Sequence, residues 1–136
     1  MTTYFMVGTI HGGWHGHGAR EMLDDWIEAG EWVLGWHDME SDPSYRKQAP
    51  NLDLMEPGDV LVAKQMNNDF ATMLVKAIGV VTEPATDGHR VGVDWVRDFR
   101  SAPVTLPSSY RQTLTRVSDT PASRTLIKDH ILPLMC

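Results

Sequence analysis

Three apolar segments separated by turn residues constrain the fold of this chain more than any other feature. They are VLVAKQ at 60–65, MLVKAIGVV at 73–81 and RVGVDWV at 90–96. The first and third alternate in side-chain direction as half-buried strands do, and the second is nearly continuous apolar. The connecting segments are rich in Asn, Asp and Gly, which favour tight turns. We therefore predict an antiparallel three-stranded meander over residues 60–96.

The segments before the meander predict two more strands and a helix. Residues 4–10 are β-rich and apolar, and WVLGW at 32–36 is typical of a strand or a tight turn. Between them, residues 19–31 have apolar side chains at three- and four-residue spacing, which predicts a helix that ends at Gly30. The polar segment 37–54 contains two prolines, so we expect a loop with one helical turn at most.

The C-terminal part of the chain predicts two helices, at 108–117 and 122–135. Ser118 or Asp119 is expected to cap the second helix, with Pro121 near its start. Together these elements predict one α+β domain over residues 1–136. Its architecture is a small curved, mostly antiparallel β-sheet or barrel of about five strands with flanking helices.

The charge of the chain limits the partners that we expect. The net charge is −6 and the sequence pI is about 5.4, which argues against a protein that coats duplex DNA through its phosphates. A pocket for one nucleotide or another small molecule remains compatible with this charge. The chain has no apolar run of about 18 residues, and its only cysteine is Cys136. We therefore expect a cytoplasmic protein without a disulfide framework.

Six sequence pieces in fixed order resemble a known family. They are YFMVG, EAGEWVLGW, MEPGDVLVAK, VKAIGVV, DGHRVGVDW and YRQTLTRV, which together run from about residue 4 to about residue 118. This series resembles EVE-like modules of the PUA superfamily, most of all those at the N-terminus of some McrB-type AAA+ restriction proteins. Two features depart from that pattern: the segment between Lys64 and Met73 is short, and the chain carries no P-loop, Walker or nuclease motif.

The resemblance implies a PUA-like fold with a pocket for a flipped-out, often modified base at the concave side of the sheet. Trp32 and Trp36 would supply aromatic faces, and a stacked base gains about 1–3 kcal/mol from such a face. Polar contacts to the base edge would come from Lys64, Gln65, Asn67 and the backbone near Thr9. Asp94 and Trp95, in the family-like VDW element, are further candidates to line the pocket.

Each of these residues also has a structural interpretation. Trp32 and Trp36 are either a core pair or pocket walls, and Trp95 shares the face of two valines, which favours the core. Lys64 either extends to solvent along an apolar face or contacts a ligand. Asp94 is expected to bond either a base amine or nearby backbone.

The segment HGGWHGHGAR at 11–20 combines three histidines with four glycines. Imidazoles at short spacing are compatible with zinc, but a glycine-rich loop lacks the rigidity of a metal site and has no suitable fourth ligand. The glycines also do not match a phosphate-binding fingerprint. We therefore predict no metal and no cofactor, and we expect His11 and Trp14 to close over a ligand at the rim of the pocket.

Several arginines follow the third meander strand. Arg97, Arg100, Arg111 and Arg116 would contact phosphates if they share a face, and the alternative is scattered, solvated arginines. From the sequence we expect a binding module and not an enzyme. It would capture a modified nucleobase or nucleotide of DNA or RNA in a restriction-modification or phage-defence setting, with a separate motor or nuclease subunit as a possible partner.

Two alternatives stay open. The first keeps the fold and exchanges nucleic acid for a soluble nucleotide signal, which the acidic charge favours. The second is a small hydrolase of modified nucleosides, because some small PUA-like relatives resemble enzymes that use a lysine, a threonine and a carboxylate. Lys64 and Thr9 are the candidates for the first two roles, and Asp94 or Glu31 for the carboxylate.

Overall fold

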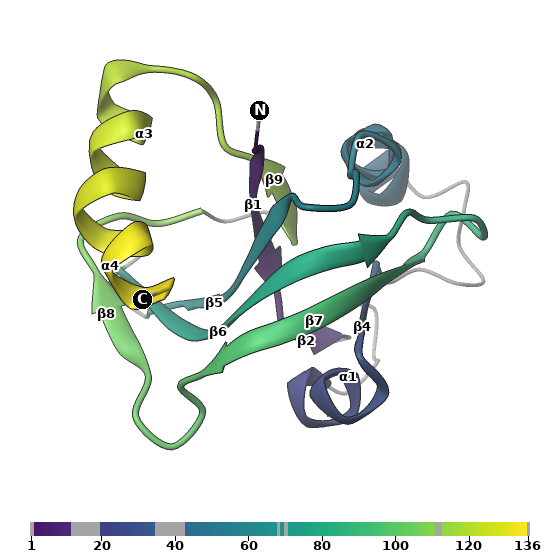
Figure 1. Ribbon diagram of the computed structural model, residues 1–136. Helices are drawn as coiled ribbons and strands as arrows, with labels where there is room; N and C mark the ends of the chain where they lie inside the picture. Colours follow the sequence, from purple (N-terminus) through teal and green to yellow (C-terminus); the bar gives the residue numbers. More distant parts are fainter. Residues whose placement is uncertain are drawn as a thin grey trace.

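The computed structural model describes residues 2–11, 20–34, 43–67, 69, 71–110 and 113–135. The chain has an α+β fold built on a mixed, curled sheet in the strand order β4-β7-β6-β5-β1-β9, with β8 paired to β6 (Figure 1). A separate two-stranded ribbon joins β2 to β3. The strands are β1 (Tyr4–Gly8), β2 (Ile10–His11), β3 (Arg20–Glu21), β4 (Glu31–Val33), β5 (Val60–Met66), β6 (Met73–Glu83), β7 (Arg90–Asp98), β8 (Val104–Leu106) and β9 (Leu114–Arg116).

The predicted meander is confirmed, since β5, β6 and β7 pair antiparallel in sequence order. The sheet is also mostly antiparallel, as predicted. The exception is β1, which pairs parallel to β5 from Tyr4 opposite Val60 to Gly8 opposite Lys64. Over the part of the chain that the structure describes, the sheet has seven strands instead of about five, because short segments before and after the meander extend it.

Register shifts curl the sheet. One shift lies where Ala63 pairs with Ala77 but Lys64 pairs with Val75, so Lys76 is the extra residue on β6. Such β-bulges bend a strand and redirect side chains. A further shift follows Ile78, at Gly79. A Cβ on Gly79 would lie 2.3 Å from Val93 Cγ1, so glycine is needed for β6 and β7 to pack this closely.

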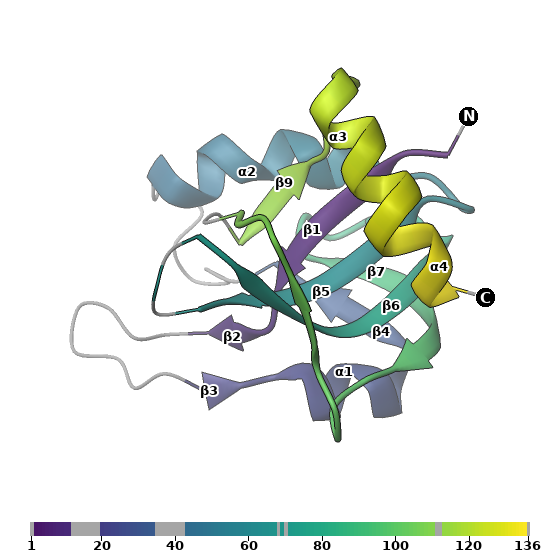
Figure 2. The same ribbon diagram turned by 90° about the vertical axis from the view of Figure 1, so that its left-hand side faces the viewer.

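Both faces of the sheet are buried. One core contains Phe5, Val7, Leu61 and Trp32 and is covered by α1 (Leu23–Ala29) and α2 (Pro43–Asp53). The other contains Met6 and the valines of β5 that alternate with the first set. It is covered by one C-terminal helix made of α3 (Pro121–Leu126), the π-helical turn η1 (Ile127–Ile131) and α4 (Leu132–Met135), which Figure 2 shows crossing the sheet. Because side chains alternate in direction along β1 and β5, each of these strands contributes residues to both cores.

The helix α2 corrects the prediction of a loop over 37–54. Its inward residues Tyr45, Gln48, Ala49 and Leu52 follow the i, i+3, i+4, i+7 pattern of an amphipathic helix. Pro43 begins the helix, where a missing N–H costs little, and Pro50 lies inside it. The two prolines conceal the apolar face in the sequence, because proline inside a segment normally argues against a helix.

The predicted helix over 108–117 is wrong wherever the structure describes it, since residues 108–110 are not helical and residues 114–116 form β9 against β1. The sequence LTR has no strong preference, and tertiary pairing decides its conformation. The N–H of Leu114 donates to Oε1 of Gln48 at 2.7 Å, so α2 also satisfies the edge of β9. The helix predicted over 122–135 is confirmed, but its cap is Thr120, whose Oγ1 accepts from the Ser123 N–H.

The helix predicted over 19–31 is shorter than expected. It covers Leu23–Ala29 as α1, while residues 20–21 form β3 and residues 31–33 form β4. Gly30 ends α1 in the left-handed region with φ of 68°, as predicted. Among the described residues, no helix is long and apolar enough to span a membrane.

Candidate functional site

A small cavity lies where β1 and β5 end. Its volume is about 160 Å³, and we call it the β1–β5 cavity. Its lining residues are Gly8, Thr9, Ile10, Lys64, Gln65, Met66 and Thr113. Since β1 and β5 are parallel, their carboxyl ends meet at the same edge of the sheet. The fold thus brings together Thr9, Lys64 and Gln65, three of the residues that the sequence predicted as ligand contacts.

Lys64 is the most unusual residue of this cavity. Only 4% of it is exposed, and its Nζ donates to the carbonyl oxygen of Tyr110 at 2.6 Å. Burial lowers the pKa of Lys64 from 10.5 to about 8, because a charged ammonium is poorly solvated there. A lysine on an apolar face normally extends to solvent, so a buried one at a cavity wall is a candidate to bind an acceptor or an anion.

Thr9 belongs to a second polar cluster at the same end of the sheet. It is 1% exposed, and its Oγ1 donates to Oε2 of Glu21 at 3.2 Å. Lys76 Nζ lies 3.0 Å from the same carboxylate oxygen and 3.5 Å from Thr9 Oγ1. The three side chains form a closed hydroxyl, carboxylate and ammonium cluster, positioned by the bulge at Lys76 and by β3.

Sequence reasoning missed Glu21 and gave Lys76 no role. A lysine inside the apolar run MLVKAIGVV was the available signal, because such a strand is buried on both faces. Glu21 carried no signal, since we placed it in the first turn of a helix. Its contact with Thr9 depends on the ribbon of β2 and β3, which the short segments around residues 10 and 20 did not predict.

The tryptophans have different outcomes. Trp32 is fully buried, packs edge-on against Trp26 at 5.9 Å between ring centroids, and donates its indole N–H to Gly8 O. Of the two roles that the sequence left open for Trp32, the structure shows the core role. Its hydrogen bond nevertheless holds Gly8, a residue of the cavity wall. Trp95 is half-buried and donates to Glu31 O, also as a core residue. Trp14 and Trp36 lie outside the described residues.

Other predicted contacts lie away from the cavity or serve the fold. Asn67 closes the β5–β6 hairpin through Thr72, and Asp94 is exposed on β7, two strands from β5. His11 is in β2, and its side chain is outside the described part of the chain. No described aromatic ring lines the cavity, so the predicted stacking face has no counterpart among these residues.

Two of the predicted phosphate contacts, Arg97 and Arg100, already bind other groups of the protein. Arg97 donates to the carbonyl oxygen of Met135, which ties β7 to the C-terminal helix. Arg100 is held by Asp98 and Asp24, both at 2.7 Å, so two carboxylates already neutralise it. Arg111 lies outside the described residues. Arg97 and Arg100 are thus both engaged by groups within the protein.

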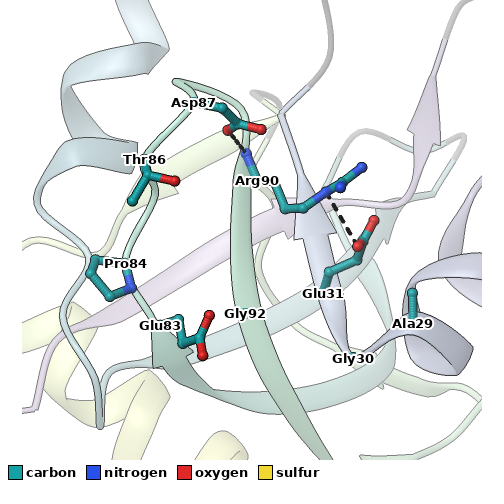
Figure 3. Close-up of a pocket in the computed structure, with 9 residues that line it drawn as sticks. All are labelled: Ala29, Gly30, Glu31, Glu83, Pro84, Thr86, Asp87, Arg90 and Gly92. Carbon is teal, nitrogen blue, oxygen red and sulfur yellow. Dashed lines mark hydrogen bonds and ion pairs between the residues drawn. The ribbon is translucent and has the colours of Figure 1, made fainter.

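A larger pocket of about 450 Å³ lies at the β6–β7 turn (Figure 3). Glu31, Glu83 and Asp87 give it an acidic lining, and Figure 3 shows the Arg90 side chain directed to Glu31, at 3.2 Å. Asp87 accepts hydrogen bonds from the N–H groups of Arg90 and His89, which keeps its pKa low. These carboxylates organise a turn, and the pocket offers a nucleotide an unfavourable charge.

Two further observations bear on the chemistry of the candidate site: one concerns metal ligands among the described residues, and the other the comparison with known proteins. Within the described ranges, no three His, Cys, Asp or Glu side chains gather as metal ligands, and His15, His17 and Cys136 lie outside those ranges. The chain matches no model of a protein family and no curated protein. The EVE-like resemblance thus stays a prediction, and the function has to be argued from the geometry of the cavity.

Proposed function

We propose that this protein is a binding module for a single nucleobase or nucleotide, including modified forms, with the β1–β5 cavity as its recognition site. The observation that carries the proposal is the buried ammonium of Lys64 at the wall of a small cavity. Keeping a charge out of water is costly, and an acceptor supplied by a ligand would add to the hydrogen bond with Tyr110 O and offset more of that cost.

The chemistry of the lining suits the edge of a base. Lys64 donates to oxygen or ring-nitrogen acceptors, and the Gln65 amide both donates and accepts. The cavity of about 160 Å³ is smaller than the ~300–1,000 Å³ of pockets for drug-sized molecules. It therefore favours a compact ligand, with the rest of a nucleotide or strand outside. The sequence prediction assigned stacking to Trp32 and Trp36, of which Trp32 lies in the core and Trp36 lies outside the described residues.

The proposal covers two ligand sources. A flipped modified base in DNA or RNA would place the protein beside a motor or nuclease subunit in a restriction or phage-defence system. A soluble nucleotide would need no such partner. Salt separates the two, because binding to a polymer weakens steeply with salt, whereas binding of one nucleotide depends on salt much less.

The test is a thermal-shift and calorimetric screen of modified and unmodified nucleosides, nucleotides and short single- and double-stranded oligonucleotides at two salt concentrations. We expect one ligand class to stabilise the protein and Gln65→Ala and Lys64→Met to weaken its affinity at least tenfold. Lys47→Met, on the exposed side of α2, is the matched control. Failure of every ligand to bind folded protein, or equal loss with Lys47→Met, would refute the proposal.

A second candidate function follows from the Thr9, Glu21 and Lys76 cluster. Oε2 of Glu21 already accepts a hydrogen bond from the Thr9 hydroxyl, and a carboxylate in this position can activate a hydroxyl as a nucleophile. In an N-acylated nucleoside, Thr9 Oγ1 would bond to the acyl carbon and its proton would pass to Glu21. Lys76 would stabilise the oxyanion, the amine would leave with that proton, and water would hydrolyse the resulting ester.

This hydrolase hypothesis replaces the sequence assignment to Lys64 with Lys76, and the carboxylate Asp94 or Glu31 with Glu21. Product formation from N-acylated nucleosides would be followed by chromatography. We expect Thr9→Val and Glu21→Gln to abolish turnover, and Glu21→Gln to leave ligand binding intact because Glu21 does not line the cavity. Glu28→Gln, exposed on α1, should leave turnover unchanged. Binding without turnover in the unmodified protein would leave the binding module as the function.

A further inference from the structure

A second pocket lies at the opposite end of β1 from the β1–β5 cavity. It has a volume of about 410 Å³ and is bounded by the start of β1 at Tyr4, the end of β9 at Arg116 and the C-terminal helix at Lys128. Figure 2 shows the N-terminal end of β1 beside this helix. We call it the β9–η1 pocket. It shares no lining residue with the β1–β5 cavity.

The pocket is basic although the protein is acidic. Its lining has three cations, Arg116, Arg124 and Lys128, and one carboxylate, Asp119. Arg124 Nε donates to Asp119 at 2.6 Å, so this pair is mutually neutralised. Among the ion pairs of the described residues, none involves Arg116 or Lys128. Two uncompensated cations thus face one pocket in a chain of net charge −6.

Four of the remaining lining residues are apolar or aromatic, and the other three, Thr2, Thr3 and Ser118, carry hydroxyl groups. Tyr4, Val117 and Ile127 belong to the second core and reach the pocket from three elements. Leu132 completes the wall and is 43% exposed, which makes it one of the few large exposed apolar side chains. Burial among these groups raises the pKa of the Tyr4 phenol above its usual value, in keeping with a poorly hydrated wall.

The wall on the helix side is a π-helical turn. Residues Ile127–Ile131 form η1, and the N–H of Leu132 bonds back to Ile127 O. This wide turn presents Ile127, Lys128 and Leu132 to the pocket and buries Ile131. Single π-helical turns within α-helices are rare and occur frequently at functional sites. The helix is thus distorted at the place where it faces the pocket.

We infer that the β9–η1 pocket binds a small organic carboxylate with an apolar body. The carboxylate would pair with Arg116 and Lys128, and the aliphatic or aromatic body would lie against Tyr4, Ile127 and Leu132. The volume lies in the range of about 300–1,000 Å³ that is typical of small-molecule pockets. Cations at the rim orient such a ligand, and the apolar walls supply the larger share of its binding free energy.

The experiment is an NMR titration of the full chain, with assigned backbone amides, by octanoate and by phenylacetate. We expect saturable shifts at residues 116–132 from at least one of them. Acetate carries the carboxylate without the apolar body, and octanol carries the apolar body without the carboxylate. Each should therefore bind at least tenfold more weakly than the carboxylate that gives saturable shifts. The inference does not rest on the proposed function, because that site is read out separately at residues 8–10 and 64–66.

The variant Arg116→Gln/Lys128→Gln should weaken carboxylate binding at least tenfold. The matched control Arg46→Gln/Lys47→Gln removes two exposed cations from α2 and should leave it unchanged. Thermal midpoints would show that both variants are folded. The inference is overturned if neither carboxylate gives saturable shifts, if the shifts lie outside this pocket, if acetate binds equally well, or if both double variants behave alike.

Discussion

Burial of Lys64 should make the stability of this protein depend on pH in an unusual direction. The pKa of this lysine is about 8 in the folded protein and 10.5 in the unfolded chain. Each unit of difference corresponds to 1.36 kcal/mol. Retaining the charged form in the folded protein therefore lowers the free energy of unfolding at neutral pH by about 3 kcal/mol. The group is almost fully buried, so solvent does not screen this penalty.

The sign follows from proton binding. Between pH 8 and pH 10.5 the unfolded chain holds the Lys64 proton more tightly than the folded protein does. The free energy of unfolding then rises with pH across this window. Below pH 8 both states are protonated and the full penalty is present. Above pH 10.5 both states are neutral and the penalty is gone.

The variant Lys64→Met removes this titration and keeps a similar side-chain length. Between pH 7 and pH 10.5 the free energy of unfolding of the unmodified protein should rise by about 3 kcal/mol relative to that of the variant. Urea unfolding followed by tryptophan fluorescence at half-unit pH steps measures this gap. Other titrating groups are common to both proteins, so their effects cancel.

The control for this measurement is Lys47→Met, which removes an exposed lysine from α2. Its stability should run parallel to that of the unmodified protein at every pH. If the Lys64→Met curve is parallel as well, the ammonium is solvated in solution and the reasoning is refuted. A bound anion should raise the pKa of Lys64 again, so ligand binding near pH 8 should take up a proton, which calorimetry in buffers of different ionisation enthalpy detects.

Three further predictions concern the scaffold and are checked by urea unfolding. Trp32→Ala should lower the free energy of unfolding by about 3–5 kcal/mol, and a cost below about 1 kcal/mol would contradict its place in the core. Gly79→Ala should cost about 1–3 kcal/mol, because the new methyl group would collide with Val93. Gln48→Ala should lower the free energy of unfolding by about 1–3 kcal/mol, because it leaves the buried N–H of Leu114 unpaired. The Leu114 amide should then also lose its protection from hydrogen exchange.

The part of the fold that was predictable from sequence is the part held by local pattern. The meander over 60–96 was recognised because alternation and turn residues lie within each segment. Gly30 was recognised as a helix end for the same reason. The strand β9 was not, because its three residues become a strand only through pairing with β1, more than 100 residues away. Non-local pairing leaves little trace in a short segment.

The candidate site shows the same division. Thr9, Lys64 and Gln65 were each singled out from the sequence, but their meeting at one cavity depends on the parallel pairing of β1 and β5. The cluster of Thr9 with Glu21 and Lys76 depends in addition on a bulge in β6. Residue type indicated the chemistry, and register decided which groups lie within hydrogen-bonding distance.

The charge distribution argues for recognition of individual ligands instead of a coated polymer. With net charge −6, the protein repels a polyanion at long range, yet Lys64 places a buried cation at a cavity wall. A protein that neutralises many phosphates loses affinity steeply as salt rises, with a slope set by the number of contacts. Here Arg97 and Arg100 already bind other groups of the protein, and the β1–β5 cavity offers a polymer the single cation Lys64. We therefore expect a salt slope of about one contact for any nucleic acid that binds. A slope of several contacts would place recognition on a surface other than the β1–β5 cavity.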